Sequence, residues 1–212
     1  MRLINVESRL LEEFVAEIPH YAILSHTWGD DEVVFQDFVH SSEEARRQKK
    51  GFAKILKTCE LAKSSGLRYA WVDTCCIDKS SSAELGEAIN SMFRWYRGAI
   101  VCYAWLTDLV PDSSSEPDAE ALKGCRWFKR GWTLQELIAP RAVEFYDANW
   151  NFRGSKCGLK SLLTDITKVP DNVLESPESL YTLSVADGCL GCLSAKQLGL
   201  KIWRTACWAS ST

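Results

Sequence analysis

Short apolar runs recur along the chain, separated by polar or glycine-containing segments. Four of them have the length of a β-strand: Tyr21–Ser25, Tyr69–Asp73, Ala99–Leu106 and Ala142–Tyr146. A continuous apolar run of this length is typical of a strand that is buried on both faces, as in parallel sheets. The pattern therefore predicts four strands in the interior of the protein.

Between these runs the apolar residues repeat at helical spacing. Residues 52–62 carry such a stripe, and Gly66 follows at the position of a C-terminal cap. Residues 81–98 begin with the Ser-x-x-Glu spacing of a capping box and end at a glycine. A short helix is predicted over Trp132–Ile138, just before a proline.

Strands and helices thus alternate along the chain. This order predicts an α/β fold with a parallel sheet of four or five strands flanked by helices. In such sheets ligands bind outside the carboxyl ends of the strands. Those ends lie at Ser25–Gly29, Asp73–Lys79, Thr107–Asp108 and Asp147, where polar and aromatic residues collect. A functional site is therefore expected at this edge of the sheet.

The charge and hydropathy of the chain argue against two classes of partner. The net charge is −3 and the only basic run, residues 46–50, is short, so no nucleic-acid surface is expected. The central apolar run Ala99–Leu106 is far too short to span a membrane. Residues 1–10 mix charged and polar side chains and do not resemble a secretory signal. We therefore expect a cytoplasmic protein whose nine cysteines are free thiols.

Two pairs of cysteines have spacings that would suit a metal site or a reactive thiol. Cys189 and Cys192 have C-x-x-C spacing, but no second pair and no nearby histidine accompanies them, so no metal site is predicted. Cys75 and Cys76 lie between two acidic residues on a segment expected to be extended, so their side chains should point to opposite faces. The sequence identifies no base for a thiol nucleophile there, and both cysteines are interpreted as structural.

Three long motifs stand in order along the chain. They are YAILSHTWGDDEVVFQDF, GLRYAWVDTCCIDKSSSAELGEAINSMFRWY, and CRWFKRGWTLQELIAP with VEFYDANW. Together they resemble the HET (heterokaryon incompatibility) domain of filamentous fungi. The resemblance implies a role in the regulated cell death that follows fusion of genetically different fungal cells. It divides the chain into a lead-in at 1–20, a HET core at 21–156, the C-terminal part of the domain at 157–186 and an atypical tail at 187–212.

Three segments of these motifs carry a second resemblance. One strand runs into Ser25–Asp30, another runs into the acidic loop Asp73–Ser82, and Trp132–Leu137 looks like a Trp-Cys-Leu-x-Glu-Leu stretch. These segments are similar to TIR domains, which have a flavodoxin-like parallel sheet and several of which cleave NAD+ when they oligomerise. In plant TIR domains the glutamate of that stretch is the catalytic acid, and it corresponds to Glu136. The resemblance implies NAD+ as a substrate and no bound cofactor.

Two interpretations of Glu136 stay open at this point. Glu136 lies three residues after Thr133, so one interpretation is that it closes the start of a helix by bonding the Thr133 amide. The other is that its carboxylate stabilises the oxocarbenium ion that develops on the ribose as nicotinamide leaves. The two differ in where the carboxylate points.

Further candidates follow from the chemistry of their side chains. His26 suits acid–base work because its ordinary pKa is about 6.5, and the alternative is a hydrogen-bonded structural histidine. Trp28 and Trp132 offer ring faces on which a nucleobase or nicotinamide would stack, and they also suit a core or an interface. The remaining candidates for substrate binding are Ser25, Gly29, Asp73 and Asp78.

The resemblance also implies partners. We expect self-association and control by a regulatory protein or a fused receptor module, and Asp73–Ser82 corresponds to a loop that TIR domains use for assembly. The alternative to an enzyme is a non-enzymatic module whose homotypic assembly recruits a death effector, or an inactive truncated fragment.

The tail departs from the HET pattern after Ser184–Ala186. The family continues with a stretch similar to Ile-Glu-Asp-Met-Ala-Tyr-Cys-Leu-Leu-Gly-Ile, which this chain lacks. Compatible codons for Gly199–Ser210, read from the last base of the first codon, encode that stretch. We therefore interpret the residues from about Asp187 onward as a frameshifted translation, which sequencing of genomic and transcript DNA would test. On this interpretation the C-x-x-C spacing is accidental.

Overall fold

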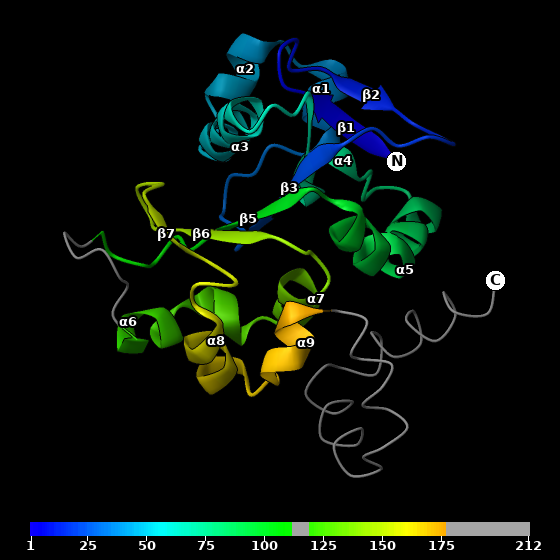
Figure 1. Cartoon of the computed structure of the whole chain (residues 1–212). Helices are drawn as coiled ribbons and strands as arrows, with labels where there is room; N and C mark the ends of the chain where they lie inside the picture. Colours follow the sequence, from blue (N-terminus) through cyan, green and yellow to red (C-terminus); the bar gives the residue numbers. More distant parts are fainter. Residues whose placement is uncertain (112–118, 177–212) are drawn as a thin grey trace.

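The computed structural model describes residues 1–111 and 119–176, which form one mixed sheet with helices around it (Figure 1). The strands lie in the order β2-β1-β4-β3-β5-β6-β7. Their bounds are β1 Arg2–Asn5, β2 Leu11–Glu13, β3 Tyr21–His26, β4 Tyr69–Trp71, β5 Val101–Trp105, β6 Val143–Tyr146 and β7 Phe152–Ser155.

The four predicted strands form the parallel centre of the sheet. β3 pairs with β4 on one side and with β5 on the other, and β5 pairs with β6, all in parallel. All six residues of β3 are buried, as expected for a strand that is covered on both faces. The predicted α/β class with a largely parallel sheet is therefore confirmed.

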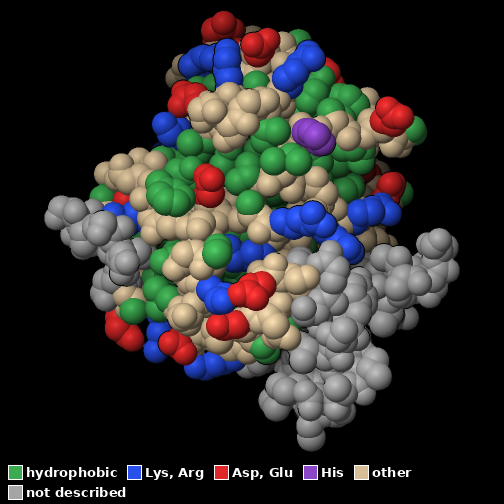
Figure 2. Space-filling view, in the orientation of Figure 1, with side chains coloured by type: hydrophobic (Ala, Val, Ile, Leu, Met, Phe, Trp, Pro, Cys, Tyr) green, Lys and Arg blue, Asp and Glu red, His purple; other side chains and the backbone are tan. Residues whose placement is uncertain are grey.

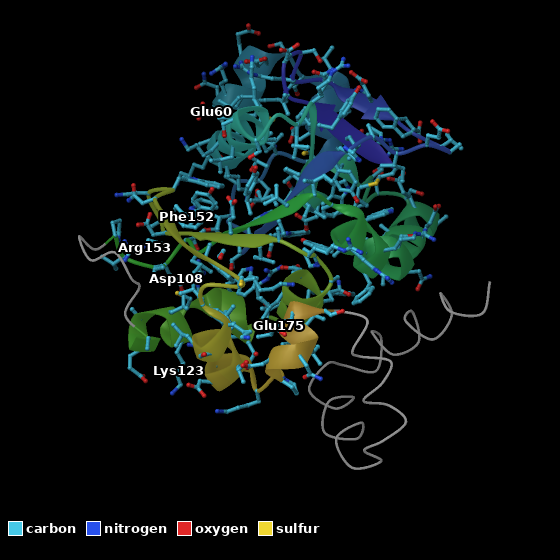
Figure 3. The ribbon with its side chains drawn as sticks, in the orientation of Figure 1. Glu60, Asp108, Lys123, Phe152, Arg153 and Glu175 are labelled. Carbon is cyan, nitrogen blue, oxygen red and sulfur yellow. The ribbon has the colours of Figure 1, made fainter. Side chains whose placement is uncertain are left out.

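The predicted number of strands is too low, because the described residues form seven rather than four or five. The segment 1–20, expected to be a lead-in, supplies β1 and β2, and β1 pairs antiparallel with β4. At the opposite edge β7 pairs antiparallel with β6, and Figure 3 labels its Phe152 and Arg153. These three strands have three or four residues each and polar flanks, so they leave no clear period in the sequence.

Helices pack on both sides of the central strands. In Figure 1, α2 and α3 lie above β5 and β6, while α6, α8 and α9 lie below them. The bounds are α1 Phe35–His40, α2 Glu43–Arg47, α3 Phe52–Ser64, α4 Asp73–Cys76, α5 Ser82–Gly98, α6 Ala119–Gly124, the 3-10 helix η1 Arg126–Lys129, α7 Thr133–Ile138, α8 Lys160–Thr167 and α9 Asp171–Glu175. On the face shown in Figure 2, exposed acidic and basic side chains are interspersed around a central band of hydrophobic ones.

Local signals set the ends of the two long helices. Gly66 follows α3 with a φ of 75°, a left-handed conformation that glycine adopts without strain. The Ser81 side chain accepts a hydrogen bond from the Glu84 amide and caps α5 as predicted. The Glu84 carboxylate does not complete the capping box, because it accepts instead from the Asp78 amide and from Arg2.

The cysteines at 75 and 76 are structural, as predicted, although their backbone is not extended. Asp73–Cys76 forms α4 directly after β4, and both thiols are buried in the core. Burial raises the pKa of Cys75 well above its ordinary value, so this thiol is a poor nucleophile. Cys189, Cys192 and the proposed frameshift lie outside the described residues. None of the helices within residues 1–111 and 119–176 has the length and apolar character needed to cross a membrane.

Candidate functional site

A cleft of about 560 Å³ opens where β3 and β4 end, at the edge where the strand order predicts a site. One wall consists of apolar side chains of α5. The rest of the lining consists of Thr27 and Ile77 together with two acidic, two basic and two aromatic side chains: Asp73, Glu136, Lys79, Arg130, Trp28 and Trp132. The charges balance, so the cleft suits a ligand that carries both signs of charge.

Glu136 is held at the cleft by contacts to other elements. Its side chain is 2% exposed, and its Oε2 accepts a hydrogen bond of 2.5 Å from the Ser25 hydroxyl at the end of β3. Arg130 donates to both carboxylate oxygens, at 3.0 Å and 3.1 Å. The carboxylate therefore has fixed donors on two sides, which pre-organises it.

The helix-cap interpretation of Glu136 is wrong. Thr133 is the first residue of α7, and its amide donates to the Arg130 carbonyl rather than to Glu136. The Thr133 hydroxyl donates to the Trp127 carbonyl. The spacing of a capping box is present, but burial against Ser25 and Arg130 turns the Glu136 carboxylate away from its own helix start.

Burial dominates the electrostatics of the two acids in the cleft. It raises the pKa of Glu136 above its ordinary value, against the opposing effects of the Arg130 charge and the Ser25 hydrogen bond. Burial likewise raises the pKa of Asp73, against the nearby Lys79 charge and a hydrogen bond from Trp28. Carboxylates with raised pKa values are better bases and are typical of catalytic sites.

His26 is the last residue of β3 and lies beside Asp73. Its side chain is buried, and its Nε2 is 3.7 Å from Asp73 Oδ1. Neither ring nitrogen has a hydrogen-bond partner among the described residues. Burial, together with the positive charges of Lys54, Arg130 and Lys79, lowers the pKa of His26 well below 6.5, so the ring is neutral at physiological pH. His26 does not line the cleft.

Three of the six proposed substrate-binding residues line the cleft and three do not. Trp28, Asp73 and Trp132 line the cleft. Ser25 lies fully buried behind it and acts on the cleft through Glu136.

Gly29 and Asp78 lie outside the cleft lining. The Gly29 amide donates to Glu32 Oε1, so its environment is the loop after β3. Asp78 accepts from the Ser80 amide and hydroxyl, and it organises the turn before α5. Both residues belong to the loops that carry Trp28 and Asp73, and neither lines the cleft itself.

Two basic residues of the cleft were not predicted. Arg130 stands six positions before Glu136, a spacing with no helical or strand meaning, so only the tertiary turn between η1 and α7 brings the two together. Lys79 follows Asp78 in the acidic, serine-rich loop. A lone cation in that loop was a visible signal. It now stands over Trp28 with Nζ 3.4 Å from the ring centre.

A buried ion pair supports the loop that carries Trp28. Lys54 of α3 is 4% exposed and pairs with Glu32, whose Oε1 also accepts the Gly29 amide. Burial lowers the pKa of Lys54, while the hydrogen bond that its ammonium donates to Glu32 opposes that effect. This pair ties the loop after β3 to the helix behind it.

Comparison with known proteins identifies the family of the chain. Residues 21–123 match the family model described as "Heterokaryon incompatibility protein (HET)". In an alignment 174 residues long that covers 79% of the chain, the chain is 46% identical to "Vegetative incompatibility protein HET-E-1" of Podospora anserina. The chain belongs to the HET family.

The matched part of this HET chain spans 13% of the length of the Podospora protein. Among solved structures there is no match to it. The family model covers β3 through nearly all of α6 and so includes Ser25, Trp28, Asp73 and Lys79. Arg130, Trp132 and Glu136 lie beyond that model, on the other wall of the HET cleft.

Proposed function

We propose that this HET domain acts in heterokaryon incompatibility, and that its cleft cleaves the bond between ribose and nicotinamide in NAD+. The observation that carries the catalytic part is the Glu136 carboxylate, buried and held by Ser25 and Arg130 at the wall of the cleft. The name of the Podospora relative and the match to the family model support the biological role. Triggering of cell death would follow from loss of NAD+.

In the proposed reaction the bond between ribose C1′ and the nicotinamide nitrogen breaks, and both electrons leave with nicotinamide, which becomes neutral. The positive charge that develops on the ribose is stabilised by the Glu136 carboxylate. Water adds to C1′ and gives up a proton. The Asp73 carboxylate lies in the same cleft and is suited to accept this proton as a base, because burial raises its pKa.

The test compares Glu136→Gln with a matched change elsewhere. The Arg2–Glu84 pair has the same two-point geometry, with distances of 2.5 Å and 3.0 Å, and Glu84 lies outside the cleft lining. We expect release of nicotinamide by the purified chain, clustered through an inducible dimerising fusion, to fall about 100-fold or more in Glu136→Gln. Glu84→Gln should keep the rate of the parent. Thermal unfolding of both variants checks that each remains folded.

A second candidate is a module that assembles with copies of itself and recruits a death effector. Exposed apolar side chains around the edge strand β2 favour it, since Leu10 is 56%, Val15 94% and Ile18 43% exposed. Apolar groups next to an unpaired strand edge are typical of interaction surfaces. Cell killing that survives Glu136→Gln, with NAD+ intact, but is lost in Val15→Lys would favour assembly over catalysis. Control by a partner or a fused module belongs to the same proposal.

A further inference from the structure

Lys79 lies in a position that the surrounding groups prepare for a cation. Its Nζ is 3.4 Å from the centre of the Trp28 ring and 3.9 Å from Asp73 Oδ2. The Trp28 indole N–H donates to the same Asp73 oxygen at 2.8 Å, which fixes the ring relative to the carboxylate. We call the Trp28 ring face together with the Asp73 carboxylate the cation seat.

The ammonium of Lys79 fits this seat poorly. Its Nζ is buried and has no hydrogen-bond partner among the described residues, although an ammonium carries three N–H donors. Asp73 Oδ1 is also buried without such a partner. Because a buried ammonium without hydrogen bonds loses its hydration and regains little, Lys79 is held by the ring face and by charge alone. Its side chain is still 26% exposed, so it has a path to solvent.

We propose that the cation seat binds a positively charged pyridinium ring, and that Lys79 occupies the seat in the free protein as a built-in competitor. A pyridinium ring is flat and weakly hydrated, and its charged nitrogen carries no N–H that would stay unpaired. It can stack on Trp28 with its positive charge beside Asp73. Lys79 then swings outward from the loop between α4 and α5 and recovers its hydration.

The inference rests on the proposed function for its natural ligand, the oxidised nicotinamide ring of NAD+. Trp28, Asp73 and Lys79 line the same cleft as Glu136, so a ring in the seat would place its ribose inside the cleft. The neutral ring of NADH would gain much less from the seat. Lys79 therefore sets both the affinity of the site and its preference for the oxidised ring.

Calorimetric binding of 1-methylnicotinamide tests this without turnover, because that cation has no ribose bond to cleave. Neutral nicotinamide is the comparison ligand. We expect Lys79→Met to bind 1-methylnicotinamide roughly fivefold more tightly than the parent, while Lys79→Arg, which keeps a cation on the ring, binds it as weakly as the parent. Nicotinamide should bind all three alike. Adding Trp28→Leu to Lys79→Met should remove the gain.

Equal affinity for 1-methylnicotinamide in the parent and in Lys79→Met would overturn the inference, as would an equal gain for neutral nicotinamide. The outcome is separable from that of the proposed function. Tighter binding by Lys79→Met with no Glu136-dependent loss of NAD+ would keep the cation seat and reject the enzyme. Glu136-dependent loss of NAD+ with unchanged binding in Lys79→Met would keep the enzyme and reject Lys79 as a competitor.

Discussion

The hydroxyl of Ser25 donates a hydrogen bond of 2.5 Å to the carboxylate of Glu136, although the two residues are separated by 111 positions. The same hydroxyl accepts from the Trp127 indole N–H at 2.7 Å. One fully buried serine at the end of β3 thus joins η1 and α7 and sets the position of the acid in the cleft.

Ser25→Ala should destabilise the protein through this junction. The change leaves the Trp127 indole N–H buried without its acceptor and removes one donor from Glu136, so we expect a loss of about 1–3 kcal/mol in the free energy of unfolding. Urea unfolding followed by circular dichroism measures it. Ser64→Ala is the matched control, since the Ser64 hydroxyl is exposed and bonds only the Leu61 carbonyl within its own helix. Equal effects of the two changes would contradict the role given to Ser25.

His26 should make the stability fall as the pH drops below 6.5. Burial first, and then the charges of Lys54, Arg130 and Lys79, hold the pKa of folded His26 well below 6.5. Below pH 6.5 His26 is therefore protonated in the unfolded chain but not in the folded chain. As a result, the free energy of unfolding rises with pH up to about pH 6.5. The raised pKa values of Asp73 and Glu136 act with the opposite sign, so only a comparison of variants isolates the histidine.

His26→Gln should accordingly flatten this profile. Below pH 6.5 the free energy of unfolding should decrease less steeply in His26→Gln than in the parent, by up to about 1.4 kcal/mol per pH unit. Urea unfolding at pH 7.5, 6.5 and 5.5 gives the comparison (roughly one-unit steps suffice to resolve such a slope). The exposed His20, changed in the same way, is the control. Parallel profiles for the parent and His26→Gln would show that this histidine does not titrate as its surroundings demand.

The buried Lys54–Glu32 pair should be worth far more when broken than an exposed pair. Lys54→Met leaves Glu32 buried without its cation, and we expect a loss of about 3–5 kcal/mol in the free energy of unfolding. Lys57→Met is the control, because the Lys57–Glu60 pair spans 3.3 Å on the exposed side of the same helix. We expect the control to change the free energy by less than about 0.5 kcal/mol.

The double variant Lys54→Met with Glu32→Gln completes a cycle on this pair. It should recover part of the loss, because it removes the unpaired charge. A double variant as unstable as the sum of both single changes would show that the two residues are not coupled.

Two glycines should respond to alanine in opposite directions. A Cβ on Gly51 would meet Glu32 Oε2 at 2.8 Å and the Asp31 carbonyl oxygen at 2.9 Å, so Gly51→Ala must shift the loop behind the cleft. We expect it to cost about 1–3 kcal/mol. Gly86 lies within α5 with nothing within 4 Å of its Cβ position, so Gly86→Ala should stabilise the helix by about 0.5–1 kcal/mol. Thermal unfolding of both variants tests this. A shift of the unfolding temperature in the same direction for both would contradict the opposite effects expected at Gly51 and Gly86.

The sequence predicts those parts of the fold that repeat locally. The apolar runs that become β3 to β6 and the stripes of α3 and α5 are visible because burial on a fixed period demands apolar side chains at that period. The edge strands β1, β2 and β7 escape notice because three or four residues complete barely two periods. Each of them forms only by pairing with a neighbouring strand of the sheet.

The sequence predicts only part of the candidate site, for a related reason. Trp28, Asp73, Trp132 and Glu136 follow strands or lie in the predicted short helix, so the strand-end rule finds them. What Glu136 does depends on Arg130 and Ser25, and no spacing along the chain encodes either contact. The capping interpretation failed because it considered only neighbours in sequence.

The central position of β3 has a consequence for synthesis on the ribosome. Tyr21 pairs with Tyr69, and Ala22 pairs with Val101, so both partners of this fully buried strand are translated long after it. Until β4 has emerged β3 has neither partner, and until β5 has emerged one of its edges stays unpaired, so this largely hydrophobic segment is prone to aggregation or chaperone binding during synthesis. We expect the yield of soluble protein to depend on the speed of translation between residues 26 and 101 more than on the stability of the finished fold.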